Sequence, residues 1–430
     1  MKKRIPYSVS DYRKIVSGEF YYVDKTRYIS ELEQWEVPLF LRPKRFGKSL
    51  WCSTLAYYYD INYKDDFEQL FGNTAVGKHP TAEHNTYAVM QFSFAGIVTQ
   101  GGIDEIRDNF NDCCHDVFLK FISRYPSLGL TADAVPRDAI SALRDIFRAV
   151  QLKGLPPVYV IIDEYDNFTN SLLTSHGLDE YHSVTTGDSF LRTFYKVVKE
   201  AVGNGMVGRV FMTGVLPVTL DDMTSGFNIA KNVSFLPTLE GMIGFTQRDV
   251  TGLVDEIFQD YNLSSDLKRI VLEELKNNYD GYSMIPLTAE KLYNSTICNN
   301  YLSELTVERS IPRKSVDVNL TIDRNWFRLM MQSNDQVPDL MCAILGSGTV
   351  SFSEDHLSQC FNAMSFQDRN ALLLLFFHLG LLTWDDEDTL RIPNQNQLVL
   401  FGQYCRELQG WSVPDDSIST AVRQFKTTLN

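Results

Sequence analysis

The sequence predicts an α/β fold over roughly its first half, in which a parallel β-sheet carries helices on both faces, followed by a largely helical remainder. Up to about residue 240, apolar segments of about six residues alternate with longer stretches that have apolar residues at three- and four-residue spacing. Strands that alternate with helices in this way form parallel sheets. Beyond about residue 245 the strand signals fade.

Five apolar segments are candidate core strands, and three longer stretches between them are candidate helices. The strands are expected at Val37–Leu41, Ala88–Phe94, Val158–Ile162, Gly208–Thr213 and Asn232–Phe235. The helices are expected at Ile103–Tyr125, Asp138–Leu152 and Asp188–Val202. Their apolar residues recur with the period of a helix that covers a sheet on one side.

The second half is expected to begin with a helical subdomain. A pair of helices is predicted at Thr246–Tyr261 and Asp266–Tyr279. Thr246 has Asp249 three residues further on, which is the spacing of a helix-capping arrangement.

The last part of the chain predicts a winged-helix-like unit. Leu372–Trp384, the acidic turn 385–388 and Thr389–Ile392 outline a helix followed by two short strands. We therefore expect three domains, an α/β core at 1–240, a helical lid at 241–305 and a C-terminal domain at 306–430.

Composition and charge argue against several classes of protein. The 430 residues contain 54 Asp and Glu against 40 Lys and Arg, a net charge of −14, which opposes general binding to DNA or RNA. Seven cysteines without a C-x-x-C pair argue against a disulfide framework and a zinc knuckle. The N-terminus turns polar at once, and the longest apolar run falls well short of the roughly 20 residues of a membrane span. We expect a soluble, cytoplasmic protein.

A phosphate-binding motif follows the first predicted strand. Arg42-Pro43-Lys44-Arg45-Phe46-Gly47-Lys48-Ser49 leads into an amphipathic helix that starts at Leu50. A helix N-terminus offers unpaired N–H groups and partial positive charge to phosphate oxygens. We expect Lys48 to reach the β- and γ-phosphates and Ser49 to hold Mg²⁺. The expected nucleotide contacts are Arg45, Phe46, Gly47, Lys48, Ser49 and Leu50.

The motif is degenerate, because the full P-loop pattern has a glycine where this chain has Arg42. The alternative interpretation is a solvated basic turn, formed by Arg42, Lys44, Arg45 and Lys48.

Two adjacent carboxylates support the P-loop interpretation. Asp163 and Glu164 end the apolar segment that starts at Val158. Acids at the end of a buried strand are unfavourable without a charge-balancing task. We expect Asp163 to hold the Mg²⁺ shell and Glu164 to polarise the attacking water. Solvated acids at a strand end are the alternative.

Thr213 ends another apolar strand and is a candidate sensor of the γ-phosphate or of the attacking water. Threonine is also an ordinary strand residue, and the sequence favours neither interpretation.

Short motifs along nearly the whole chain resemble those of one family. They are Tyr7–Tyr12, Tyr21–Thr26, Arg42–Ser49, Ile162–Asp166, Met212–Val215, Gly244–Thr246, Tyr279–Tyr282, Tyr293–Asn294 and Arg391–Asn394. Together they resemble the bacterial AAA-ATPase-like family, whose members commonly carry a C-terminal PD-(D/E)XK-type nuclease domain. The resemblance implies a P-loop NTPase fold of the additional-strand class (ASCE) with ATP and Mg²⁺ as cofactors.

The resemblance also bears on individual residues. The family usually has Arg-Pro-x-Arg-Phe-Gly-Lys-Ser, so Arg42 in place of glycine is a family trait. Related ATPases often place residues before the first core strand near the nucleotide base, which makes Asp24 and Lys25 candidate contacts. A helix-cap role for Asp24 is the alternative.

The chain departs from the family in three places. The family often has asparagine at Asp280 and proline at Ser295, and both positions are expected to lie outside the phosphate site. After Arg391–Asn394 the chain continues for about thirty-six residues and shows no Asp, Glu-x-Lys constellation. We therefore expect no nuclease domain here.

The sequence favours a P-loop ATPase that acts as a nucleotide-gated switch, and the resemblance implies a setting in defence or in mobile-element biology with a nuclease partner. The rival hypotheses are a non-hydrolysing nucleotide-binding scaffold and a DNA-binding adaptor. A homo-oligomer and the choice between ATP and GTP stay open. Candidate arginine fingers are Arg45, Arg209 and Arg248.

Overall fold

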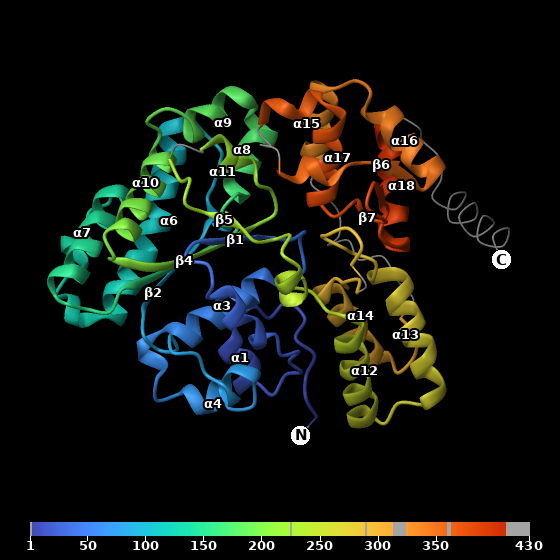
Figure 1. Ribbon diagram of the computed structural model, residues 1–430, viewed down its shortest axis with the longest axis horizontal. Coiled ribbons are helices and arrows are strands. Elements are labelled where there is room, and N and C mark those ends of the chain that lie inside the picture. Colours follow the sequence, from blue (N-terminus) through green and yellow to red (C-terminus); the bar gives the residue numbers. More distant parts are fainter. Residues whose placement is uncertain (1, 224–225, 289, 313–323, 359–362, 410–430) are drawn as a thin grey trace.

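The computed structural model describes residues 2–223, 226–288, 290–312, 324–358 and 363–409. At its centre lies a five-stranded sheet in the order β2-β3-β4-β1-β5, and every neighbouring pair is parallel. The strands are β1 Pro38–Leu41, β2 Ala88–Ser93, β3 Val158–Asp163, β4 Val207–Gly214 and β5 Lys231–Asn232. This confirms the predicted parallel sheet (Figure 1).

The fifth strand is shorter than the predicted segment Asn232–Phe235. The backbone N–H of Val233 still bonds to the carbonyl of Leu39 at 2.9 Å. The N–H of Leu41, however, donates to the hydroxyl oxygen of Ser234 at 2.7 Å. A side chain therefore takes the place of the next rung of the ladder and ends the strand.

Strand β4 lies between β1 and β3, which is the additional strand of the predicted class. The carboxyl ends of parallel strands share one edge of a sheet, where α/β proteins bind their ligands. The loop after β1 and the acids after β3 are therefore brought to the same edge.

Apolar residues on the strands alternate between two core clusters. Phe40, Ile161 and Phe211 belong to the cluster that includes α3 (Lys48–Tyr59) and the apolar residues of α15–α18. The neighbouring strand residues, such as Val160 and Met212, belong to the cluster on the opposite face. That face is covered by α6 (Ile103–Arg124), α7 (Ala139–Leu152) and α10 (Phe190–Gly203). Helices therefore cover both faces, as predicted.

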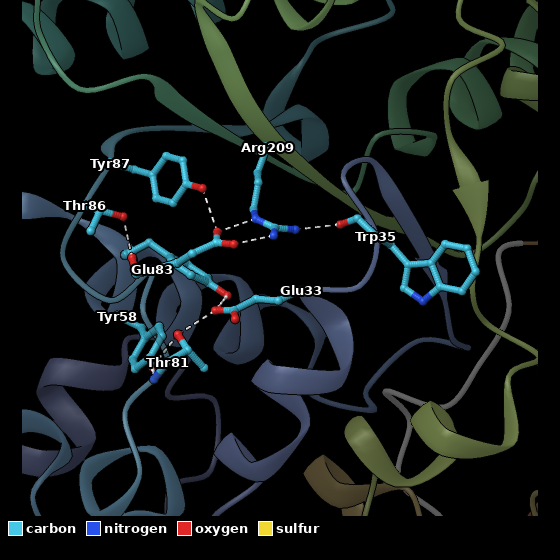
Figure 2. Close-up of polar contacts among 9 residues, drawn as sticks. Glu33, Trp35, Tyr58, Thr81, Glu83, Thr86, Tyr87 and Arg209 are labelled. Carbon is cyan, nitrogen blue, oxygen red and sulfur yellow. Dashed lines mark hydrogen bonds and ion pairs between the residues drawn. The ribbon is translucent and has the colours of Figure 1, made fainter.

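A network of polar side chains closes the amino-terminal edge of the sheet (Figure 2). Arg209 near the start of β4 makes a bidentate ion pair with Glu83 and donates to the carbonyl of Trp35 at 2.9 Å. Burial raises the pKa of Glu83, but the Arg209 guanidinium outweighs this and holds that pKa below its usual value. Arg209 thus lies at the edge opposite the phosphate-binding motif, which excludes it as an arginine finger within this chain.

Helices α12 (Gln247–Tyr261), α13 (Ser265–Tyr279) and α14 (Ser295–Glu308) form a cluster of their own. The predicted capping arrangement is confirmed, because Thr246 and Asp249 form a reciprocal capping box at the start of α12. In the view of Figure 1, these helices lie below the C-terminal helices and to the right of the sheet.

The C-terminal region combines helices with a small antiparallel sheet in the order β6-β8-β7. Its helices are α15 Arg324–Ser333, α16 Val337–Ser347, α17 Arg369–His378 and α18 Gln395–Gln409, and its strands are β6 Thr349–Ser351, β7 Thr383–Trp384 and β8 Thr389–Arg391. The predicted helix followed by two short strands is therefore present. Its assignment as a winged helix stays a prediction, as do the three domain boundaries.

The remaining helices are short, and α8 contributes to the site described below. They are α1 Tyr12–Ser17, α2 Ile29–Leu32, α4 Phe67–Phe71, α5 Ala75–Lys78, α8 Asn167–His176, α9 Leu178–Thr185 and α11 Val218–Asp222. Within the described ranges, no helix has both the length and the apolar character needed to cross a bilayer.

Candidate nucleotide-binding site

The loop after β1 turns sharply into α3. Gly47 caps the helix with φ of 100°, in the left-handed region that favours glycine, and the preceding Arg45 has φ of 71°. Helix α3 begins at Lys48, two positions before the predicted start at Leu50. Its free N–H groups therefore open directly onto the loop.

Lys48 is held at the centre of this loop. Its Nζ donates to the carbonyl oxygens of Arg42 at 2.9 Å and Pro43 at 3.0 Å. Burial lowers the pKa of Lys48, while the nearby carboxylates of Asp163 and Glu164 favour its charged form. The ammonium is thus a buried cation whose partners are carbonyls that an anionic ligand can replace.

Asp163 and Ser49 form an oxygen pair beside this lysine. Burial raises the pKa of Asp163, and a hydrogen bond from the Ser49 hydroxyl opposes the shift. The Oδ1 atom of Asp163 is buried and has no hydrogen-bond partner among the described residues. A hydroxyl and a carboxylate are hard oxygen ligands of the kind that Mg²⁺ takes, completed by phosphates and water. The residues therefore fit a magnesium ion.

Glu164 has an unusual backbone conformation, with φ of 51°. Non-glycine residues in this region are uncommon and concentrate at functional sites. Its carboxylate lines a cavity and accepts a hydrogen bond from the side-chain amide of Asn167. The turn after β3 therefore carries its carboxylate toward open space.

Asp166, which the sequence singled out only as part of a motif, ties the ends of β3 and β4 together. Its carboxylate accepts from the N–H groups of Val215 at 3.1 Å and Leu216 at 2.7 Å and from the Asn170 amide at 2.7 Å. Burial raises the pKa of Asp166, and these donors oppose the shift. The apolar strand pattern ended at Glu164, so only the motif Ile162–Asp166 signalled this residue.

A cavity of about 650 Å³ joins these groups, a size typical of ligand sites. Predicted site residues that line it are Arg45, Gly47, Lys48, Ser49, Leu50 and Glu164. Walls come also from the N-terminal Pro6 and Ser8–Ser10, from α8, from Phe245, Ser295, Thr296 and Asn299, and from Trp326 and Leu379. Segments that lie far apart in the sequence therefore meet around one space.

Two predicted site residues lie behind the cavity wall. Thr213 is fully buried, and its hydroxyl donates to the carbonyl of Phe40 at 2.7 Å between β4 and β1. The ordinary strand role thus describes Thr213, and the structure does not support the sensor role. Phe46 is also buried, and its ring packs against Tyr282 with 5.0 Å between centroids. Its side chain therefore points away from the cavity, and only its backbone is available to a ligand.

The structure also does not place Asp24 and Lys25 on the cavity. Asp24 accepts from the N–H groups of Thr26 at 2.8 Å and Ala75 at 2.7 Å, the first residues of a short 3₁₀ helix and of α5, whose N-cap residues are Lys25 and Thr74. Lys25 forms a buried ion pair with Asp249. Their hydrogen bonding to distant elements could not be read from sequence. The N-terminal contribution comes instead from Pro6 and Ser8–Ser10, inside another family motif.

Arg42 takes the place of the first P-loop glycine for a structural reason. Its guanidinium is buried, donates to the carbonyls of Ser234 and Glu240 at 3.0 Å each, and stacks over Phe40 at 4.1 Å. The side chain anchors the start of the loop, where conventional P-loops have glycine. The alternative of a solvated basic turn is wrong for Arg42 and Lys48, because both are buried.

The structure corrects the expected position of Ser295 and reduces the number of candidate arginine fingers. Ser295 lines the cavity and Asn294 bonds to the carbonyl of Lys44, so the position of the family proline does not lie outside the site. Of the candidate arginine fingers, Arg45 lines the cavity, whereas Arg248 is exposed on α12.

The parallel sheet, the loop and the paired acids define a P-loop module of the ATPase class. A family model described as "Predicted AAA-ATPase" matches residues 6–224, about half of the 430 residues. The chain belongs to this predicted AAA-ATPase family.

Two further comparisons found one related sequence and one structure with a similar fold. The chain is 27% identical over 296 residues to an uncharacterized protein in vnfD 5'region of Azotobacter chroococcum mcd 1, covering 68% of this chain and 50% of that protein. The aligned region therefore spans half of the relative's length. The Walker-type ATPase PABY2304 of Pyrococcus abyssi matches with a TM-score of 0.52 at 12% identity, covering 94% of this chain and 99% of that one. At this identity the match shows the fold.

Proposed function

We propose that this protein binds ATP with Mg²⁺ in the cavity and hydrolyses it. The observation that carries the proposal is the meeting of Lys48, Ser49 and Glu164 around a cavity of ligand size at one edge of the sheet, with Asp163 bonded to Ser49 behind it. Two buried amide oxygens on the cavity wall, of Asn170 and Asn299, have no partner among the described residues. Buried acceptors of this kind call for a donor from a ligand or from water.

Each residue has a defined task in this proposal. Lys48 would exchange its two carbonyl partners for phosphate oxygens, and the N-terminus of α3 would add its N–H groups. Ser49 and Asp163 would hold Mg²⁺, which when bound neutralises charge on the phosphates. Glu164 would orient a water molecule and take its proton. Asn167, which holds the Glu164 carboxylate in this structure, would release it for that step.

The proposal includes a switch function, because Ser295 and Thr296 of α14 and Asn167 of α8 share the cavity with the loop. A change in the bound nucleotide would bias the positions of these helices. A nuclease partner and a role in defence rest on the family resemblance alone. A DNA-binding adaptor is disfavoured, because Asp386, Glu387 and Asp388 are exposed in the turn between β7 and β8.

The test is nucleotide binding by calorimetry together with steady-state phosphate release, for wild type and Lys48→Ala. The loss of a charged hydrogen-bond donor should raise the Kd for Mg·ATP roughly 10- to 100-fold and abolish turnover. Lys64→Ala, an exposed lysine outside the cavity lining, is the matched control. Chelation of Mg²⁺ should also stop turnover, and GTP in place of ATP measures base preference. Unchanged ATP affinity in Lys48→Ala would refute the site.

A further inference from the structure

Three successive carbonyl groups of the phosphate loop receive hydrogen bonds from the start of α14. The side-chain amide of Asn294 donates to the carbonyl of Lys44 at 3.1 Å. The N–H of Thr296 donates to the carbonyl of Arg45 at 3.1 Å, and the hydroxyl of Ser295 donates to the carbonyl of Phe46 at 2.7 Å. We call Asn294–Thr296 the lid turn.

These bonds determine the direction of the loop N–H groups. A peptide unit is planar and trans, so its C=O and the next N–H point in opposite directions. Carbonyls of residues 44–46 that point toward the lid turn therefore direct the N–H groups of residues 45–47 away from it. A loop that binds phosphate needs its N–H groups turned toward the anion and its carbonyls satisfied elsewhere.

The contact is buried and close. Asn294 and Ser295 are 2% and 7% exposed. A Cβ atom on Gly47 would lie 3.3 Å from the Ser295 hydroxyl oxygen, which leaves little room between the loop and the lid turn. Asn294 has a second task, since its side-chain oxygen accepts from the N–H of Ile297 and caps α14. The Thr296 donor is one of the unpaired N–H groups of a helix N-terminus.

We propose that the lid turn is a positioning element of the phosphate site. Its three donors hold the loop in the binding conformation, a task that glycine-rich loops perform through their own backbone. The inference rests on the proposed nucleotide site and adds residues about 250 positions away from the loop. It also makes the lid a direct sensor of the loop, because displacement of α14 would release three carbonyls at once.

The experiment separates positioning from folding. Asn294→Ser keeps a capping oxygen on a neutral side chain and removes the amide donor. Ser295→Ala removes the hydroxyl, and Ser295→Thr retains it as the conservative variant. Ser303→Ala, two turns along the same helix and outside the cavity lining, is the matched control. For each protein, the Kd for Mg·ATP is measured by calorimetry and the unfolding midpoint is measured without nucleotide.

We expect Asn294→Ser and Ser295→Ala each to raise the Kd roughly tenfold, with unfolding midpoints close to wild type and with wild-type affinity in Ser295→Thr and Ser303→Ala. A lower unfolding midpoint in Asn294→Ser would mean that the cap of α14 is also weakened. The affinity of Ser295→Ala then tests the proposal. Unchanged affinity in Ser295→Ala, with a wild type that binds ATP, overturns the lid turn and leaves the nucleotide site standing. A wild type that binds no ATP overturns both.

Discussion

Glu164 illustrates how a single residue is prepared for chemistry. The strand β3 places it at the sheet edge, and a left-handed backbone conformation turns it away from the line of the strand. Such a conformation costs of the order of 1 kcal/mol or more and persists only where the surroundings impose it. Here the N–H of Tyr165 is fixed by the carbonyl of Thr213 at 3.1 Å, which holds the turn after Glu164.

We predict that Glu164→Gln binds Mg·ATP with near wild-type affinity and loses phosphate release. The amide cannot take the proton of the attacking water, and loss of a general base typically lowers rates by about 10²- to 10⁴-fold. Single-turnover phosphate release beside calorimetry is the measurement. Glu180→Gln, an exposed glutamate on α9, is the control. Undiminished turnover in Glu164→Gln would remove Glu164 from the mechanism.

At the scale of elements, side chains of the N-terminal segment bind to α12. Lys25 pairs with Asp249, whose carboxylate also completes the capping box of α12. Near them, the Tyr21 hydroxyl donates to Asp260 at 2.7 Å, and Lys3 pairs with Glu256 at 3.3 Å. Burial lowers the pKa of Lys25, and Asp249 opposes that shift. Solvent therefore has little access to the Lys25 ammonium and limited access to the Asp249 carboxylate.

Lys25→Met should destabilise the chain by about 3 kcal/mol, because it leaves the partly buried Asp249 carboxylate without its cation. Asp249→Asn keeps a side-chain oxygen for the cap. Urea unfolding of both single variants and the double variant gives the coupling between the two charges. We expect the double variant to be markedly more stable than the sum of the single effects implies, and additive effects would mean that the two charges do not interact.

Elements with a local signal could be predicted from the sequence. The strands and main helices have strong apolar periodicity, and the strand, loop and helix around Lys48 are contiguous in the sequence. The sequence therefore predicts that the loop and the acids after β3 meet at one edge of the sheet, and their roles in nucleotide binding stay a prediction. Features that depend on distant partners were missed. The Thr213 hydroxyl donates to the carbonyl of Phe40, and Lys25 forms an ion pair with Asp249. The lid turn bonds to a loop about 250 residues away, and no pattern in the sequence relates the two.

At the scale of the whole molecule, the core on the α3 face of the sheet continues into the C-terminal helices. His378 at the end of α17 belongs to this contact. Burial and the positive charge of Arg42 lower its pKa from 6.5 to about 3. The unfolded chain therefore takes up a proton on His378 at a much higher pH than the folded chain does. Between these two values the unfolded state binds more protons, so stability falls as the pH decreases below about 6.5.

We predict that His378→Gln reduces this acid sensitivity. Protonation of His378 in the unfolded chain alone should remove about 2 kcal/mol of stability between about pH 7 and pH 5, and the variant should lack that component. The measurement is the difference in unfolding free energy between variant and wild type across this range. Burial also raises the pKa of the Asp60 and Asp166 carboxyl groups, but both proteins share these groups, so their contributions cancel in the difference. Parallel pH profiles would contradict the prediction.

The lid turn has a consequence for how such chains can be recombined during evolution. The matched family segment, residues 6–224, contains the loop carbonyls, whereas their donors lie at Asn294–Thr296, outside it. Exchange of the segment between relatives would separate acceptors from donors unless the recipient offers an amide and a hydroxyl at the same place. Selection would then act on loop and lid jointly, with a change in one compensated by a change in the other.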